Sequence, residues 1–317
     1  MNTSRSMILF ALALCGASCR NSPDAQRRFE FSYETTITDL PAAASQARIW
    51  IPVPSSDDAQ DVLSIDIDAP IPHRLGRDRV YANQMAYLEI SAPFPEEVTI
   101  RLTAHVRRRE SSSSVTSFGS IDEYRLLAGD QLAPLSAEAR ERSLAAIDGK
   151  HGTNHRALGI YDAVLRGVDY DKSGKGWGKG DLGYVCASGK GNCSDFHSLF
   201  IAMSRSAEIP AIFEIGFPIP NASHGTVKGY HCWAWYKEED GTWRPIDASE
   251  ADKDPSRSEY FFGTIDADRI AFSRGRDIVL DPAQAGPPVN FLIYPYVEID
   301  GRTKLAKVET QFHFRDR

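Results

Sequence analysis

Three residues that could together activate a thiol lie in order along the chain: Cys193, His231 and Asp247. A cysteine thiol needs a base to remove its proton, and the base needs a third group to hold its ring in place. Cys193 begins a predicted helix, His231 lies in a predicted strand, and Asp247 ends a second strand. The pattern predicts that Cys193 attacks a carbonyl carbon, that His231 is the general base and then the acid, and that Asp247 orients His231.

The residues around Cys193 have the sequence of a helix start. Asn192 is a favourable N-cap residue, and Asp195 is placed to close a capping box on the Asn192 amide. Phe196 and Phe200 continue the apolar spacing of a helix. The positive end of the helix dipole would stabilise a thiolate at this position, and the Cys193 amide could donate to an oxyanion.

The two predicted strands raise a question of register. Alternation along Tyr230–Tyr236 places His231 on one face and Cys232 on the other. Asp240-Gly241 marks a turn, after which the strand that ends at Asp247 should return antiparallel. A plain two-residue hairpin would put Asp247 on the wrong face for His231, so we expect an odd-length loop or a bulge.

The same residues have alternative interpretations. His197 lies one helical turn after Cys193 and could be the base, but a residue on the nucleophile's own helix lies beside the thiol rather than across a cleft. Trp233 and Trp235 could line a tunnel for an acyl acceptor, although we expect them to pack in the core. Cys and His are also common as packed residues, which would leave a domain without chemistry.

Several motifs of this region are similar to those of a known enzyme family. They are Gly191-Asn192-Cys193 with its apolar helix, Glu208-Ile209-Pro210-Ala211, His231-Cys232-Trp233, Trp243-Arg244-Pro245-Ile246-Asp247, Asp268-Arg269-Ile270 and Ser273-Arg274-Gly275-Arg276-Asp277. Together they resemble the bacterial transglutaminase-like core, which belongs to the papain-like cysteine hydrolases and uses a Cys-His-Asp triad. The resemblance implies an α+β fold in which the helix with the nucleophile packs on an antiparallel sheet.

Two departures from that family concern the site. Cys232 stands where the family usually has alanine, and the segment Gly183–Asn192 lacks the glutamine that often donates to the oxyanion. The second donor should then come from the glycine-rich segment Ser173–Lys190, which we expect to form a mobile wall of the cleft. Trp177 and Tyr184 are its aromatic side chains with a polar hydrogen, and we prefer Tyr184.

Composition limits the classes of partner and cofactor. The 317 residues carry a net charge of −7, and the isoelectric point is about 5.7, so nucleic acid is not an expected partner. Ser173–Lys190 lacks the spacing of a phosphate-binding loop, so we expect no nucleotide site, and we expect no cofactor. We expect no metal, because the His and Cys residues lack ligand spacing.

The N-terminus has the sequence of an export signal. Arg5 precedes the apolar run Met7–Leu14, and small residues lead to Cys19. A cysteine in this context resembles the bacterial lipoprotein box, although Gly16 stands where leucine is usual. The sequence therefore predicts a protein of the cell envelope, lipid-anchored through Cys19 and facing the periplasm.

After removal of that peptide, the internal cysteines are three. If Cys193 must stay free, Cys186 and Cys232 are the pair that could be bridged, but two small buried thiols are the favoured interpretation. Alternation turns Cys232 away from the triad face, so such a bridge need not block the site.

Composition shifts predict a signal peptide at residues 1–19, a tether at 20–28, a β-sandwich at 29–110, a linker at 111–130 and a catalytic domain at 131–317. The β region, with Trp50-Ile51-Pro52-Val53-Pro54 and Gln60, is similar to the domain that precedes some transglutaminase-like cores. In the second half, Ser136–Ile147 and Asn154–Arg166 have helical spacing. Val289–Ile299 and Thr303–Phe314, joined at Asp300-Gly301, predict a closing β-hairpin.

The sequence thus predicts a transglutaminase-like cysteine hydrolase or acyltransferase that acts on a peptide or carboxamide bond through an acyl-enzyme. Its expected partners are protein or peptide substrates, including those of the cell envelope. The alternatives are a catalytically idle binding module of the envelope and a cell-wall amidase or peptidase with a similar triad.

Overall fold

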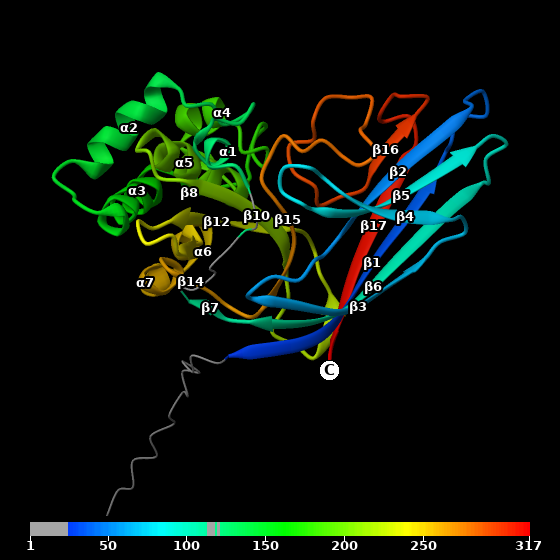
Figure 1. Cartoon of the computed structure of the whole chain (residues 1–317), viewed down its shortest axis with the longest axis horizontal. Coiled ribbons are helices and arrows are strands. Elements are labelled where there is room, and N and C mark those ends of the chain that lie inside the picture. The colour runs from blue at the N-terminus through cyan, green and yellow to red at the C-terminus, as the bar shows by residue number, and fades with distance from the viewer. Residues whose placement is uncertain (1–24, 113–117, 119–120) are drawn as a thin grey trace, which may run out of the picture.

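The computed structural model describes residues 25–112, 118 and 121–317. The strands of a β region gather on one side of the molecule, and the helices gather on the other side (Figure 1). The expected signal peptide and Cys19 lie outside the described residues. Within those residues, no helix combines the length and the apolar character needed to cross a membrane.

The β region is a sandwich of two antiparallel sheets. The first has the order β11-β17-β1-β6-β3, with bounds His224–Thr226, Lys307–Asp316, Gln26–Thr38, Glu97–Arg109 and Gln60–Asp68. The second has the order β16-β2-β5-β4, with bounds Tyr296–Ile299, Gln46–Val53, Gln84–Ser91 and His73–Arg77. Alternate residues of β1 and β2, such as Phe31 and Ile49, are buried in one hydrophobic cluster, which the two sheets share.

The closing hairpin predicted for the C-terminus is wrong. β17 pairs with β1, from Phe29↔Asp316 to Thr38↔Lys307, whereas β16 pairs with β2 in the other sheet. A tight turn does form near Asp300-Gly301, where Ile299 and Arg302 make an isolated bridge. The strands on either side of it then separate, so the end of the chain completes the N-terminal sandwich (Figure 1).

Two expected connecting segments contain regular structure. The last residues of the expected tether, 26–28, already belong to β1. The expected linker at 111–130 contains the short strand β7 (Ser111–Ser112), which pairs with β14 (Thr264–Ile265), and the helix α1 (Glu123–Leu127).

The other half packs helices on a four-stranded antiparallel sheet of the order β13-β12-β10-β15, with bounds Trp243–Ile246, His231–Lys237, Ala211–Pro218 and Arg269–Arg274. Its main helices are α2 (Ala137–Ile147), α3 (Thr153–Gly167) and α5 (Cys193–Ser206), which confirms the helical segments predicted at these places. Shorter elements are β8 (Asp169–Tyr170), α4 (Leu182–Ser188), β9 (Lys190–Gly191), α6 (Ala248–Lys253), a 3-10 turn (Pro255–Arg257) and α7 (Ser258–Phe261).

The α+β fold class predicted from the sequence is confirmed, since a helix that begins at Cys193 packs on an antiparallel sheet behind a β-sandwich. Phe200 of α5 lies against Tyr236 of β12, and both side chains are buried. This packing brings the first turn of α5 to the end of β12 at which His231 begins the strand.

Candidate active site

Cys193 occupies the first turn of α5, and the predicted capping box is present. The Asn192 side chain accepts from the Ser194 amide at 2.9 Å, and the Asp195 carboxylate accepts from the Asn192 amide at 2.9 Å. The Asn192 carbonyl accepts from the amides of Asp195 and Phe196. These contacts use the amide hydrogens on both sides of Cys193. The Cys193 amide takes no part in them and can therefore donate a hydrogen bond to a ligand.

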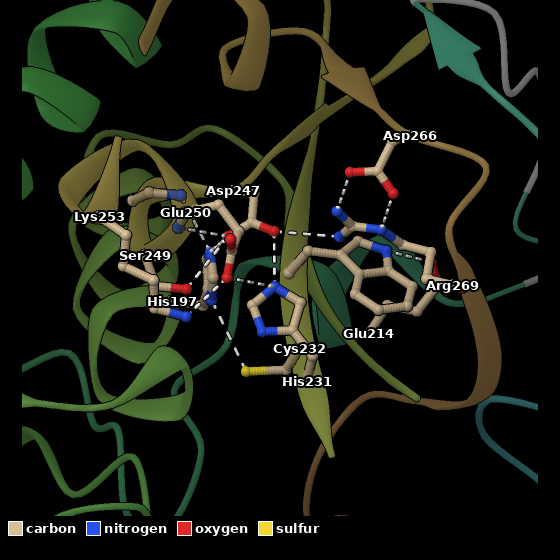
Figure 2. A network of polar contacts seen from close by, with 12 residues as sticks. His197, Glu214, His231, Cys232, Asp247, Ser249, Glu250, Lys253, Asp266 and Arg269 are labelled. Carbon is tan, nitrogen blue, oxygen red and sulfur yellow. Dashed lines mark hydrogen bonds and ion pairs between the residues drawn. The ribbon is translucent and has the colours of Figure 1, made fainter. Parts of the chain in front are cut away.

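His231 and Asp247 are brought together by the register of two strands. β12 and β13 pair from Ala234↔Ile246 to Lys237↔Trp243, so five residues, 238–242, form the loop. This odd length confirms the predicted correction of parity and puts Asp247 opposite the residue two positions after His231. His231 Nε2 lies 2.6 Å from Asp247 Oδ2 (Figure 2).

The Asp247 carboxylate is buried and accepts from donors on both oxygens. Arg269 Nη1 lies 3.0 Å from Oδ2, while the Ser249 hydroxyl and the Glu250 amide each lie 3.1 Å from Oδ1. Arg269 also holds Asp266, with Nη2 2.7 Å from its Oδ2 (Figure 2). These contacts fix the direction in which Asp247 faces His231. Sequence reasoning noted the Arg269 motif but gave it no role, because its partner is 22 positions away.

The charges of the site favour an ion pair between Cys193 and His231. Because the Asp247 carboxylate can only accept a hydrogen bond, His231 must carry a hydrogen on Nε2 and donate it to Asp247. The other ring nitrogen, Nδ1, is then left for the thiol. Burial would raise the pKa of Cys193, but hydrogen bonds from Cys232 and His231 and the charge of His231 hold it well below the usual value. Burial would lower the pKa of His231, but Asp247 and the Cys193 thiolate raise it to about 10. Both shifts favour a thiolate on Cys193 and an imidazolium at His231.

Cys232 lies in the site, contrary to the expectation that it points away. Its Sγ lies 3.8 Å from the hydroxyl of Ser194, the residue after Cys193, and 3.6 Å from His197 Nδ1. Alternation does turn Cys232 to the other face of β12, but α5 packs on that face and brings Cys193 with it. Cys186, Cys193 and Cys232 are all free thiols, so the considered bridge between Cys186 and Cys232 is absent from this part of the chain.

His197 is buried beside the site and serves as an anchor. The Ala248 amide donates to its Nε2 at 3.2 Å, and in the neutral ring this leaves the proton on Nδ1, toward Cys232. Burial lowers the pKa of His197, so the ring is neutral at physiological pH. His197 thereby connects α5 to the start of α6, which begins at Ala248.

The glycine-rich wall is held in place over part of its length. The Asp195 carboxylate accepts from the amides of Gly178 at 2.7 Å and Gly180 at 3.0 Å. Arg276 donates to the carbonyls of Lys179 and Gly180, at 2.8 and 3.0 Å. The capping residue of α5 therefore also positions the wall beside the nucleophile, where a mobile segment was expected.

Two tyrosines bear on the second oxyanion donor. The ring of Tyr184, the sequence-based candidate, packs on Gly176, where an added Cβ would lie 2.6 Å from the ring. The Tyr230 hydroxyl accepts from the Asn192 side chain at 3.0 Å, lies 3.2 Å from the Ser194 hydroxyl and donates to the Gly178 carbonyl at 3.2 Å. Sequence reasoning passed over Tyr230, although it directly precedes His231. The role of Tyr184 stays a prediction. Tyr230 is a second candidate, for which its one hydroxyl hydrogen must turn from the Gly178 carbonyl to the oxyanion.

The site is nearly closed to solvent: Cys193 is 2% exposed and His231 5%. A cavity of about 200 Å³ reaches His231 between charged side chains that include Glu250, Arg257 and Asp268. A larger cavity of about 950 Å³ is lined by residues of 286–308, two of which, Phe291 and Tyr294, contact the Tyr230 ring. In the parts of the chain that the structure describes, no group of three or more His, Cys, Asp or Glu side chains could hold a metal ion.

Comparisons with known proteins concern the fold that surrounds this site. Residues 142–248, which include Cys193, His231 and Asp247, match the Transglutaminase-like superfamily. An uncharacterized protein of Haemophilus influenzae is 28% identical over 175 residues, which are 45% of this chain and 47% of that protein, so the match spans about half of the relative's length.

A solved structure supports the fold over most of the chain. The structure of a candidate cysteine protease from Cytophaga hutchinsonii superposes with a TM-score of 0.56 and 13% sequence identity, and covers 92% of this chain and 98% of its own. At this identity, the likeness concerns the fold. With the family match at residues 142–248, it shows a transglutaminase-like fold in that part of the chain, behind a β-sandwich.

Proposed function

We propose that the protein is a cysteine hydrolase or acyltransferase in which Cys193, His231 and Asp247 form the catalytic triad. The observation that carries the proposal is the position of His231, whose Nε2 lies 2.6 Å from Asp247 Oδ2 and whose pKa is raised by both Asp247 and Cys193. This is the order of nucleophile, base and orienting group that acyl transfer requires.

The geometry supports the following steps. The Cys193 thiolate attacks the carbonyl carbon of a peptide or carboxamide, and the oxyanion accepts from the Cys193 amide. When the tetrahedral intermediate collapses, His231 donates its Nδ1 proton to the leaving amine, and a thioester remains on Cys193. Water or a second amine then attacks the thioester, gives its proton to His231 and releases the acyl group.

The expected substrate is a protein or peptide that can present a carbonyl to a thiol with 2% exposure. This exposure favours an extended chain or a side-chain carboxamide over a bulky folded surface. From the sequence of residues 1–19 we further propose that the protein acts in the cell envelope after export, with Cys19 as the lipid-bearing residue.

The test is to trap the acyl-enzyme on the full chain. A glutamine-containing peptide and an activated ester are offered, with and without a primary amine, and the tryptic peptide 191–205 is weighed. We expect the acyl group on this peptide, and we expect it to disappear in Cys193→Ala. Cys186→Ala is the matched control, because Cys186 lies in a different tryptic peptide, 180–190, and should leave the labelling unchanged.

Products decide between the reactions. A released acid indicates hydrolysis, and an amide of the added amine indicates transamidation. Cleavage of a peptide or amide bond in cell-wall fragments, and in no other substrate, would favour the cell-wall amidase or peptidase. If folded protein forms no adduct at Cys193 with any of these reagents, the triad proposal fails and the idle binding module becomes the better account.

A further inference from the structure

The triad does not account for the second thiol beside the nucleophile. Cys193 is the first residue of α5 and Cys232 the second residue of β12, and the Cys232 side chain faces the first turn of α5, where Ser194 directly follows Cys193. Cys232 is fully buried, between the Ser194 hydroxyl at 3.8 Å and His197 Nδ1 at 3.6 Å. The acyl-transfer steps proposed for Cys193, His231 and Asp247 use no second thiol.

The Cys193 thiolate is the sulfur most prone to oxidation in this site. Peroxides attack thiolates rather than thiols, and the product is a sulfenic acid. A sulfenic acid with a second thiol in contact condenses to a disulfide, whereas one without such a neighbour is oxidised irreversibly to the sulfinic acid. Two neighbouring cysteines on packed elements can therefore form a reversible disulfide, where a lone cysteine would be oxidised irreversibly.

We propose that Cys232 is the resolving thiol of Cys193, and that hydrogen peroxide or another hydroperoxide converts the pair to a reversible disulfide that switches the nucleophile off. In the first step, the Cys193 thiolate attacks the peroxide oxygen and becomes a sulfenic acid, while hydroxide leaves and takes a proton. In the second step, the Cys232 sulfur attacks the Cys193 sulfur, the S–O bond breaks, and the Cys232 proton leaves with the hydroxyl group as water. A dithiol reductant reverses the bond and restores both thiols.

The surroundings of Cys232 suit this role. Burial and the neighbouring Cys193 thiolate raise the pKa of Cys232 far above the usual value, so that Cys232 stays protonated while Cys193 is reduced. When Cys193 is oxidised, its negative charge is gone, and this influence on Cys232 disappears. Cys186 is no competitor, because its pKa is raised to about 11 and it lies on α4.

The chain provides a direct assay, since trypsin places the three cysteines in separate peptides: Cys186 in 180–190, Cys193 in 191–205 and Cys232 in 229–237. The full-length protein is treated with hydrogen peroxide, free thiols are blocked at acid pH, and the non-reduced digest is weighed. We expect peptide 191–205 joined to peptide 229–237, lighter by two hydrogen atoms than the sum. Dithiothreitol should separate them and return the labelling of Cys193 by iodoacetamide.

Variants separate resolution from mere reactivity. In Cys232→Ala and Cys232→Ser, Cys193 should pass to the sulfinic acid, and dithiothreitol should not restore its labelling. Cys186→Ala should behave like the wild type. Far-UV circular dichroism establishes that each variant is folded, and the second substitution keeps the test valid if the first one unfolds the site.

The proposal is overturned if wild-type Cys193 forms sulfinic acid as fast as it does in the Cys232 variants, or if Cys193 joins peptide 180–190 instead. It uses the reactive thiolate of the proposed function, but the mass assay needs no substrate. If the disulfide forms in a protein whose Cys193 accepts no acyl group, the proposed enzyme activity is refuted and the role of the thiol pair is supported. Acylation of Cys193 in a protein that forms no disulfide would support the enzyme and refute the role of the thiol pair.

Discussion

Replacing Asp247 by asparagine removes one charge from the centre of the site. Oδ2 accepts from His231 and Arg269, and Oδ1 accepts from Ser249 and the Glu250 amide. In asparagine, an NH2 group replaces one of these accepting oxygens and must face groups that themselves donate hydrogen bonds. The cheaper orientation keeps its oxygen toward His231 and Arg269 and turns the NH2 group toward Ser249, whose hydroxyl can accept, and toward the Glu250 amide, which cannot.

The expected loss follows from the imidazolium that Asp247 stabilises. A pKa of about 10 for His231, against 6.5 without neighbours, corresponds to on the order of 5 kcal/mol in favour of the charged ring. Burial opposes this charge, and Asp247 is the first of the groups that offset the burial. If most of this free energy is lost, turnover falls about 10³-fold, because each ten-fold change corresponds to about 1.4 kcal/mol.

The assay is turnover of an activated ester by Asp247→Asn, with denaturant unfolding in parallel. Asp266→Asn is the matched control, because Asp266 also binds Arg269 but does not touch His231. We expect the control to lose stability and to keep turnover within about ten-fold of the wild type. If folded Asp247→Asn retains more than about a tenth of wild-type turnover, Asp247 does not orient and stabilise a catalytic His231, and this reasoning is refuted.

Two further predictions concern the surroundings of the triad. Tyr230→Phe should slow acylation about 100-fold if its hydroxyl supplies the second oxyanion donor, whereas the same loss in Tyr184→Phe would support the sequence-based candidate instead; single-turnover kinetics of both variants decide, and no loss in either excludes both side chains. Arg269→Gln should lower the free energy of unfolding by about 3–5 kcal/mol, because it removes a charged partner that lies 3.0 Å from the buried Asp247; a midpoint unchanged in urea would contradict this.

The local sequence predicted the helix start and the strand pair well. Asn192 and Asp195 are a few positions apart, so the capping box depends on neighbours that any window of sequence contains. The odd loop length followed from a requirement of register, given that His231 and Asp247 share a face. These features are decided by contacts close in sequence.

The errors arose where distant segments decide the outcome. Asp300-Gly301 does make a turn, but β16 and β17 pair with β2 and β1, more than 200 positions away, and alternation along a strand does not identify its partner. In the same way, alternation gave the face of Cys232 but not the helix that packs on that face. The contact of Arg269 with the site could not be assigned from its own neighbours, since Asp247 lies 22 positions away at the start of α6.

The most direct test of the account is the pH dependence of Cys193 alkylation by iodoacetamide, resolved by tryptic peptide. The thiolate is the reactive form, so a lowered pKa moves the rate curve of Cys193 to lower pH. Cys186 is the internal standard, because its raised pKa of about 11 confines its reaction to alkaline solution.

We predict that Cys193 reacts at its full rate at neutral pH, where Cys186 is nearly inert, and that His231→Gln moves the Cys193 curve to higher pH. The shift in the variant shows that His231 causes the effect. A Cys193 curve centred near the value of a free thiol, about 8.5, and unchanged by His231→Gln, would contradict the triad.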